Sequence, residues 1–179
     1  MTKSVLALAC LIGTLSPAQA QNVPSDPWAP VRFLAGEWQG AISGDQGTGT
    51  ATRRYRFILS GQFLQERNMA NFPPQTLHPD GSVTSHASFL AYDTARKALV
   101  FRLLREDRFN GMYAYSATKS TPSRLVFESV QLDAAPAATK AREILEVVSP
   151  TEHVEILEIA EGDKPFTVHS RIQFKRRQP

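Results

Sequence analysis

Cysteine is nearly absent from this sequence of 179 residues, which contains a single one, Cys10. Cys10 lies in a short apolar stretch at the N-terminus, within a segment that we expect to be cleaved off. A chain without cysteine suits an oxidising compartment, where a free thiol would be a liability, and it cannot rely on disulfides for stability. The fold must therefore rest on a hydrophobic core of ordinary size, and thiol chemistry is excluded.

Long hydrophobic runs are also lacking. The apolar stretch at residues 5–15 is about a dozen residues long, whereas a membrane-spanning helix needs about twenty. It follows a positive start at Lys3 and precedes Ala18-Gln19-Ala20, a small-x-small cleavage pattern. These three parts predict a signal peptide over residues 1–20, cleaved near Ala20. We expect an exported protein, periplasmic or secreted, with no integral membrane span.

Strong charge of one sign is missing as well. The formal net charge is +3, and the basic cluster Lys175-Arg176-Arg177 stands at the extreme C-terminus. Proteins that bind nucleic acids usually carry a basic stripe along one face. Here both signs are spread along the chain, so we expect no nucleic-acid partner. Nothing in the sequence indicates an oligomeric state.

Sequence signatures of catalysis and of metal binding are lacking. The chain contains no nucleophile elbow, phosphate-binding loop or dinucleotide fingerprint. Its histidines lack the short spacings typical of metal sites; they are His78, His86, His153 and His169. We therefore expect a protein that is not an enzyme and holds no metal.

Alternation with a period of two is what the sequence does have. In the last segment, for example, Phe166, Val168 and Ile172 fall on one face while Thr167 and His169 fall on the other. Such alternation is required of strands with one buried face. The predicted strands are residues 37–43, 50–58, 62–70, 84–92, 97–105, 110–116, 123–131, 140–148, 152–160 and 165–176.

Short turns separate most of these strands, which implies antiparallel neighbours. About ten strands would leave long unpaired edges unless the sheet closes, so a barrel is favoured over an open sheet. We predict an all-β, up-and-down antiparallel barrel over residues 36–177, with a lead and plug segment at 21–35. Residues 71–85 form the one long predicted loop, of a length typical of a lid, a binding loop or a mobile segment.

The run Gly36-Glu37-Trp38-Gln39-Gly40 opens the first predicted strand. A wide, flat indole can plug the closed end of a barrel, and flanking glycines let the backbone bend and neighbouring strands approach. Arg176 or Arg177 can stack over the indole as a cation–π partner and connect the last strand to the first. We interpret Gly36, Trp38, Gly40 and Arg176 as structural residues.

Polar residues on predicted inward faces suggest a ligand site. Phe63, Gln65 and Arg67 share a face, and so do Tyr55 and Phe57 with Arg53. A barrel interior that mixes aromatics with an arginine can hold an amphiphile, because the guanidinium fork matches a carboxylate. The predicted ligand-binding residues are Tyr55, Phe57, Phe63, Gln65, Arg67, Phe101 and Tyr113.

Four glutamates on two adjacent predicted strands give an alternative to that interpretation. We expect most of Glu143, Glu146, Glu155 and Glu158 to be solvated outer-face residues that pair with basic side chains. A buried arginine is costly unless it is paired. Arg67 can therefore pair internally with Glu146 or Glu158 in a filled barrel, which would act as a structural or interaction module.

The Gly-x-Trp opening, the strand pattern and the closing FKRR resemble the calycin superfamily of lipocalins and fatty-acid-binding proteins. The segments SGQFLQER (60–67) and AYDTARKALV (91–100) resemble small exported bacterial barrels of unknown function within it. This resemblance implies an exported protein that binds a small hydrophobic or amphipathic ligand without a cofactor. The interior of such a barrel holds one small ligand or is filled by side chains.

A second resemblance is to nitrobindin, a haem-binding ten-stranded barrel that shares the Gly-x-Trp-x-Gly opening. It implies haem as a cofactor, with His169 on the last strand as the matching iron ligand. Alternation places His169 on the face opposite Ile172 and Phe174, toward solvent. A β-bulge would reverse that direction, because one extra residue re-aims every side chain beyond it.

Overall fold

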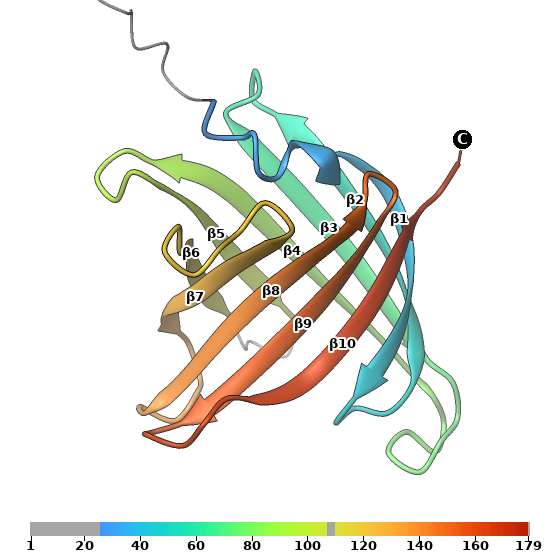
Figure 1. Ribbon diagram of the computed structural model, residues 1–179. Helices are drawn as coiled ribbons and strands as arrows, with labels where there is room; N and C mark the ends of the chain where they lie inside the picture. Colours follow the sequence, from blue (N-terminus) through green and yellow to red (C-terminus); the bar gives the residue numbers. More distant parts are fainter. Residues whose placement is uncertain (1–25, 107–109, 179) are drawn as a thin grey trace, which may run out of the picture.

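The structure is a computed structural model that describes residues 26–106 and 110–178. Ten strands form a closed barrel in which sequence neighbours pair antiparallel and the last strand pairs with the first (Figure 1). This confirms the predicted fold class. The predicted signal peptide lies outside the described residues. The strands are β1 (Gly36–Gly44), β2 (Gly49–Ile58), β3 (Phe63–Phe72), β4 (Ser82–Asp93), β5 (Ala98–Arg105), β6 (Gly111–Tyr115), β7 (Arg124–Leu132), β8 (Thr139–Ser149), β9 (Glu152–Glu161) and β10 (Thr167–Arg176).

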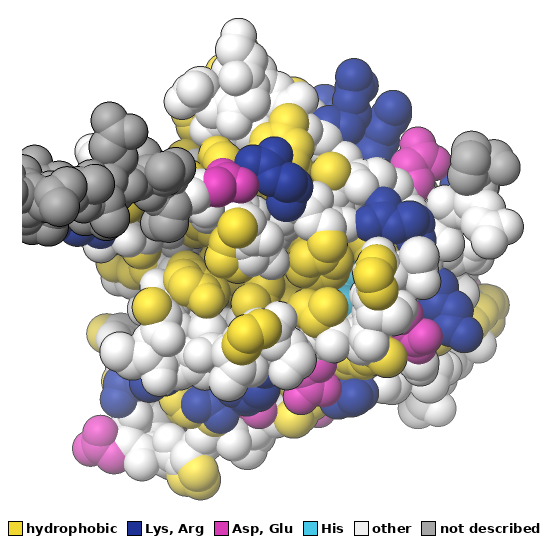
Figure 2. Space-filling view, turned by 45° about the horizontal axis from the view of Figure 1, so that its top comes forward, with side chains coloured by type: hydrophobic (Ala, Val, Ile, Leu, Met, Phe, Trp, Pro, Cys, Tyr) yellow, Lys and Arg dark blue, Asp and Glu magenta, His cyan; other side chains and the backbone are white. Residues whose placement is uncertain are grey.

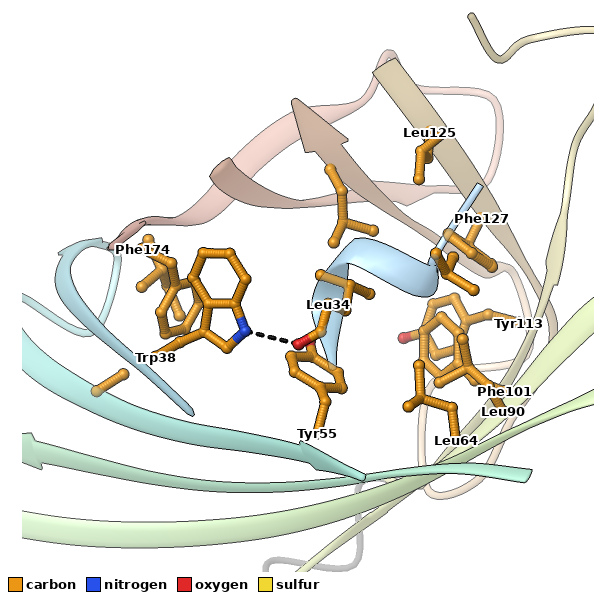
Figure 3. Packing of buried hydrophobic residues seen from close by; sticks show 14 of the residues in the cluster. Leu34, Trp38, Tyr55, Leu64, Leu90, Phe101, Tyr113, Leu125, Phe127 and Phe174 are labelled. Atoms are coloured by element: carbon orange, nitrogen blue, oxygen red, sulfur yellow. Dashed lines mark hydrogen bonds between the residues drawn. The ribbon is translucent and has the colours of Figure 1, made fainter. Parts of the chain in front are cut away.

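One end of the barrel, which we call the plug end, is closed by the segment before β1. A short 3-10 turn, η1 (Arg32–Leu34), lies across it at the top of Figure 1. The indole of Trp38 is fully buried beneath this turn, and its Nε1 donates a hydrogen bond to the Leu34 carbonyl at 2.7 Å (Figure 3). The plug is therefore joined to the core by both apolar packing and a directed hydrogen bond.

Arg176, near the end of β10, holds the plug from the other side. Its guanidinium carbon lies 4.4 Å from the centre of the Trp38 ring, at cation–π distance. Its Nη1 donates to the Ala35 carbonyl at 2.7 Å and its Nη2 donates to the Phe33 carbonyl. The stacking proposed from the sequence is thus made by Arg176, which connects the last strand to the chain before the first.

Close approach explains the two glycines that flank Trp38. A Cβ on Gly36 would lie 2.3 Å from the Arg176 guanidinium, and the residue has a φ of +134°, which side chains disfavour. A Cβ on Gly40 would lie within 2.8 Å of both Ile172 and Phe174 on β10. Glycine at these positions lets β1 and the arginine sit against their neighbours.

The surface of the plug end is apolar in its middle. Figure 2 shows hydrophobic side chains gathered at the centre of this face, with charged side chains around the edge. Half-buried aromatic residues here pack against the core; they are Trp28, Phe33, Phe57 and Tyr115. In the described part of the chain, no helix is long and apolar enough to cross a membrane.

The opposite end, which we call the cavity end, carries the loops after β1, β3, β5, β7 and β9. The loop predicted at 71–85 is shorter than expected and spans residues 73–81, because Phe72 pairs with Ser82. Polar residues on both sides of the hairpin concealed the strand alternation. The Gln75 side chain accepts a hydrogen bond from Thr48 N at 3.0 Å and donates one to Thr48 O at 2.9 Å. The loop is therefore tied to the β1–β2 connection.

Candidate ligand-binding site

Arg53 is the centre of a polar cluster inside the barrel. It lies on the inward face of β2 and is only 3% exposed. Its two terminal nitrogens bind the Glu155 carboxylate on β9, with Nη2 to Oε1 at 2.9 Å. Its Nε lies 3.0 Å from both Glu66 Oε1 and Asn68 Oδ1 on β3, and its Nη1 lies 3.2 Å from the Tyr55 hydroxyl. Strand alternation brings these groups together, because each stands at an inward position of its strand.

Glu66 is the second carboxylate bound to Arg53, and it is itself supported by two residues of β4. The His86 ring Nε2 lies 3.0 Å from Glu66 Oε1, and the Ser88 hydroxyl donates to Oε2. Burial alone would raise the pKa of Glu66, but the charge of Arg53 and the contacts of His86 and Ser88 outweigh it and lower the pKa to about 2. Glu66 is therefore ionised at neutral pH.

Glu143 on β8 completes the cluster. It stands diagonally across from Glu155, since Leu145 pairs with Glu155 and Glu143 pairs with Leu157. Burial raises the pKa of Glu143 well above its usual value, and the negative charges of Glu155 and Glu66 raise it further. A hydrogen bond between the Glu143 and Glu155 carboxyls also favours the protonated form. Within the cluster, Glu66 is thus held in the ionised form and Glu143 in the neutral form.

The polar cluster borders the packed plug end. Arg53 lies over the Phe174 ring at 4.5 Å, and Phe174 stacks on His153 at 5.1 Å. His153 is fully buried, and neither ring nitrogen has a hydrogen-bond partner among the described residues. Burial, together with the nearby charges of Arg53 and Arg176, lowers the pKa of His153 to about 3. The His153 ring is therefore neutral, and it packs against Trp38 and Phe174 as an aromatic side chain would.

A cavity of about 390 Å³ extends from the cluster toward the cavity end. Small-molecule sites commonly have volumes of about 300 to 1,000 Å³. The polar groups on its wall include Arg53, Glu66, Glu143, Glu155 and Arg105. Its apolar lining includes Ile42, Ala70, Phe72, Phe101, Leu103, Leu157, Ile159 and Ile172. The cavity therefore offers an apolar chamber with a charged wall.

Several residues predicted to bind a ligand do face the interior. Tyr55, Phe101 and Tyr113 are buried in the main core, and the rings of Phe101 and Tyr113 stack at 4.7 Å. Phe101 also lines the cavity. Phe57 instead lies toward the plug end, where its ring meets that of Trp28 at 5.3 Å. The structure thus brings Tyr55, Phe101 and Tyr113 into the interior and separates Phe57 from the cavity.

The inward direction predicted for Phe63, Gln65 and Arg67 is wrong. The buried residues of β3 are the alternate set, which includes Leu64 and Glu66, and Arg67 is exposed. Both faces of this strand carry apolar residues, so alternation alone does not identify the inner one. Gln65 and Arg67 line a different feature, an outer groove of about 680 Å³ over β1–β5.

The four glutamates predicted for the outer face divide by strand position. Glu146 and Glu158 are on the outside, where they pair with Arg171 at 3.6 Å and with Arg142. Glu143 and Glu155 face the interior instead, because inward positions alternate along β8 and β9. Arg67, which points outward, is therefore not the internal partner; that residue is Arg53.

His169 lies at the edge of the cavity. The pairing of β10 with β9 shifts between Val168 and Ser170, which is a β-bulge. The bulge separates Val168, which is half exposed, from the inward Ile172. His169 lines the cavity and its Nδ1 lies 3.1 Å from Asp45 Oδ2. The bulge interrupts the alternation of β10 at this point, so His169 reaches the edge of the cavity and does not point fully to solvent.

Most residues of the polar cluster were not found by sequence reasoning; they are Glu66, Asn68, His86, Ser88, Glu143 and Glu155. One signal was present. Arg53 shares a face with Tyr55 and Phe57, and a buried arginine requires acidic partners. Within the described residues, no group of three or more histidine, cysteine or acidic side chains is arranged to hold a metal ion.

Comparison with known proteins agrees with the fold. No known family profile matches the chain, and no curated protein sequence matches it. Rv2717c from M. tuberculosis has a similar structure, with a TM-score of 0.61 and 15% identity over 85% of this chain and 98% of that one. A redesigned β-barrel, b11L5F_LGL, gives a TM-score of 0.42 at 14% identity over 82% of this chain and 93% of its own. The structure of EF1p2_mFAP2b bound to DFHBI gives a TM-score of 0.44 at 13% identity, over 86% of this chain and 100% of its own. The likeness to Rv2717c supports an antiparallel β-barrel as the fold of this chain.

Proposed function

We propose that this protein is an exported binding protein that holds one small hydrophobic or amphipathic molecule inside the barrel, without a catalytic step. The observation that carries the proposal is the cavity of about 390 Å³, which combines an apolar chamber with the Arg53 cluster on one wall. Sites for small molecules are usually mostly apolar, with a few placed polar groups that fix orientation. The resemblance to calycins, which includes carriers of such molecules, is consistent with this proposal.

Two neighbouring residues of β3 provide a matched test of where the ligand binds. Ala70 is buried and lines the cavity, whereas Met69 is 54% exposed and lines the outer groove. The probe is N-phenylnaphthylamine, a small neutral fluorophore whose emission rises in apolar surroundings. We expect Ala70→Phe to weaken its binding at least tenfold by filling the cavity, and Met69→Phe to leave binding unchanged.

Circular dichroism and thermal unfolding should establish that both variants are folded. Weaker binding in Met69→Phe alone would move the site to the outer groove and overturn the proposal. No binding of the probe to the wild-type chain, or of any small amphiphile, would favour the filled-barrel alternative, in which the protein acts as a structural or interaction module.

Haem binding is a second candidate because His169 lies at the cavity edge. Its Nδ1 is directed at the Asp45 carboxylate, so Nε2 is the nitrogen available for iron. A histidine that ligates a metal commonly has such a carboxylate on its other nitrogen. The test is a titration of the chain with haem, followed by absorbance. A Soret shift that is lost in His169→Ala would support haem, and an unchanged spectrum would exclude it.

A further inference from the structure

The charges around the cavity indicate the chemical class of the ligand, on the basis of the proposed function. Three carboxyl groups line the cavity, on Glu66, Glu143 and Glu155. Arg53 is already bound by two of them, Glu66 and Glu155, so its guanidinium is not available as a site for a ligand carboxylate. The carboxylate-binding role that sequence reasoning gave to Arg67 is likewise not supported inside the barrel, because Arg67 is outside. Of these three carboxyls, that of Glu143 forms no ion pair with a basic side chain among the described residues, whereas Glu66 and Glu155 both bind Arg53.

Glu143 and Glu155 can be hydrogen-bonded only if a proton lies between them. Glu155 is buried and Glu143 is half-buried on the cavity wall. Two such carboxylates side by side repel each other when both are charged, so one of the pair keeps its proton. The pKa of Glu143 is raised by burial and then by Glu155 and Glu66, which agrees with this geometry. The charged and titratable groups that face Glu143 are Arg53, Glu66 and Glu155 in the cluster, with Tyr113 beside it and Arg105 and His86 on the cavity wall.

Tyr113 provides an independent indication of a missing ligand group. Its side chain is fully buried, and its hydroxyl has no hydrogen-bond partner among the described residues. Figure 3 shows this oxygen pointing toward the middle of the barrel. Burial raises the pKa of the Tyr113 hydroxyl, and the neighbouring Glu143 acts in the same direction, which places the two side chains near each other. Tyr113 stacks on Phe101, which lines the cavity. A buried hydroxyl is normally hydrogen-bonded, so this one has room for a polar partner that the described residues do not supply.

We propose that the ligand carries a protonated amine, which binds between the carboxyls of Glu143 and Glu155 with the Tyr113 hydroxyl as a further acceptor. The amine displaces the proton that the two carboxyls share, and that proton is released to solvent. Charge is then balanced, because one cation enters and one proton leaves. The apolar remainder of the ligand lies against Phe101, Leu157 and the other apolar residues of the chamber.

Three ligands with the same tail test the proposal: octylamine, octanol and octanoate. Isothermal titration calorimetry is performed between pH 6 and 8 in two buffers of different ionisation enthalpy, which measures the protons released. We expect octylamine to bind most tightly, with about one proton released and an affinity that rises up to about tenfold per pH unit. Octanol should bind more weakly, with no proton release, and octanoate most weakly.

Glu143→Gln is the decisive variant, because glutamine has nearly the same shape and can still donate a hydrogen bond to Glu155. We expect it to weaken octylamine binding roughly 10-fold to 100-fold, the range for losing a hydrogen bond to a charged group, and to abolish proton release. Octanol binding should be unchanged. The control is Glu146→Gln on the outer face of the same strand, where the side chain is 39% exposed; it should leave all three ligands unaffected.

The outcomes separate this inference from the function on which it rests. If octanoate or octanol binds as tightly as octylamine, or if Glu143→Gln leaves octylamine binding intact, the amine assignment is wrong while the binding function stands. If none of the three ligands binds, at any pH tested, both are overturned.

Discussion

The two ends of the barrel are built from the same strands but are filled in different ways. At the plug end, Trp38, Phe174 and the neutral His153 pack together, and Arg176 fastens the cover by hydrogen bonds to backbone carbonyls. At the cavity end the inward positions carry carboxyls and smaller apolar groups, and about 390 Å³ is left between them. One alternating pattern of strands can therefore give a packed cover at one end and a chamber at the other, depending on which side chains point inward.

Arg53 stands between the two ends, and its loss should have the largest effect. Arg53→Leu leaves Glu66 and Glu155 buried without a cation, and removing one partner of a buried ion pair typically costs about 3–5 kcal/mol. Urea unfolding at pH 7 measures the loss. The control is Arg54→Leu on the outer face, where the side chain is 55% exposed and lies 3.6 Å from Glu37. A similar loss in both variants would contradict the central role of Arg53.

The cover of the plug end depends on Arg176, and here we expect the next largest effect. Arg176→Ala removes the cation–π contact with Trp38 and the bonds to two carbonyls. We expect it to lower the free energy of unfolding by about 2–3 kcal/mol. Arg177→Ala, whose side chain is 56% exposed, is the matched comparison and should change it by less than about 0.5 kcal/mol. Equal effects would show that the stacking contributes nothing.

Packing at the plug end should lose stability in mild acid, because His153 is buried there in its neutral form. The folded pKa is about 3 and the unfolded value is 6.5. Between these two pH values the His153 ring is protonated in the unfolded chain but neutral in the folded one. Protonation therefore favours unfolding, and the free energy of unfolding decreases by up to about 1.4 kcal/mol for each pH unit below 6.5.

The measurement is the difference in unfolding free energy between the wild-type chain and His153→Leu, from pH 7 to pH 5. A difference is needed because Glu143 contributes a slope of opposite sign: its folded pKa is raised, so stability falls as pH rises above its unfolded value of 4.5. The leucine variant should gain stability relative to wild type as the pH falls. A difference that is constant with pH would contradict the buried neutral state of His153.

We expect the smallest effect on stability from a substitution at Arg67, on the outer face of the barrel. Arg67 is exposed on β3. Arg67→Ala should change the free energy of unfolding by less than about 0.5 kcal/mol, as surface substitutions usually do. It should also leave binding of the octyl ligands unchanged in calorimetry. A loss of binding comparable to that of Ala70→Phe would restore the outer groove as the site.

The plug end could be predicted from the sequence because its signals are local. Trp38 between two glycines, a strand that ends in arginine and a regular alternation each constrain the chain within a few residues. The same alternation correctly placed Arg53 and Tyr55 on one inner face. These features follow from strand geometry and from the size of one side chain.

The cavity end could not be predicted in the same way. Apolar residues stand on both faces of β3. One face carries Phe63 and Met69 and the other carries Leu64 and Phe72, so alternation assigned the inner face incorrectly. Glu66 was thereby placed outside, although it pairs with Tyr55 across the β2–β3 ladder. The bulge at His169 depends on how β10 meets β9, and no local sequence pattern marks it.

Native mass spectrometry of the chain, expressed from its full sequence and purified without detergent, decides whether the cavity holds a ligand. We expect one small bound molecule per chain, lost in Ala70→Phe and kept in Met69→Phe. A bare chain that takes up no added amphiphile, or a bound molecule that Ala70→Phe retains, would contradict the claim that the cavity end is a binding site.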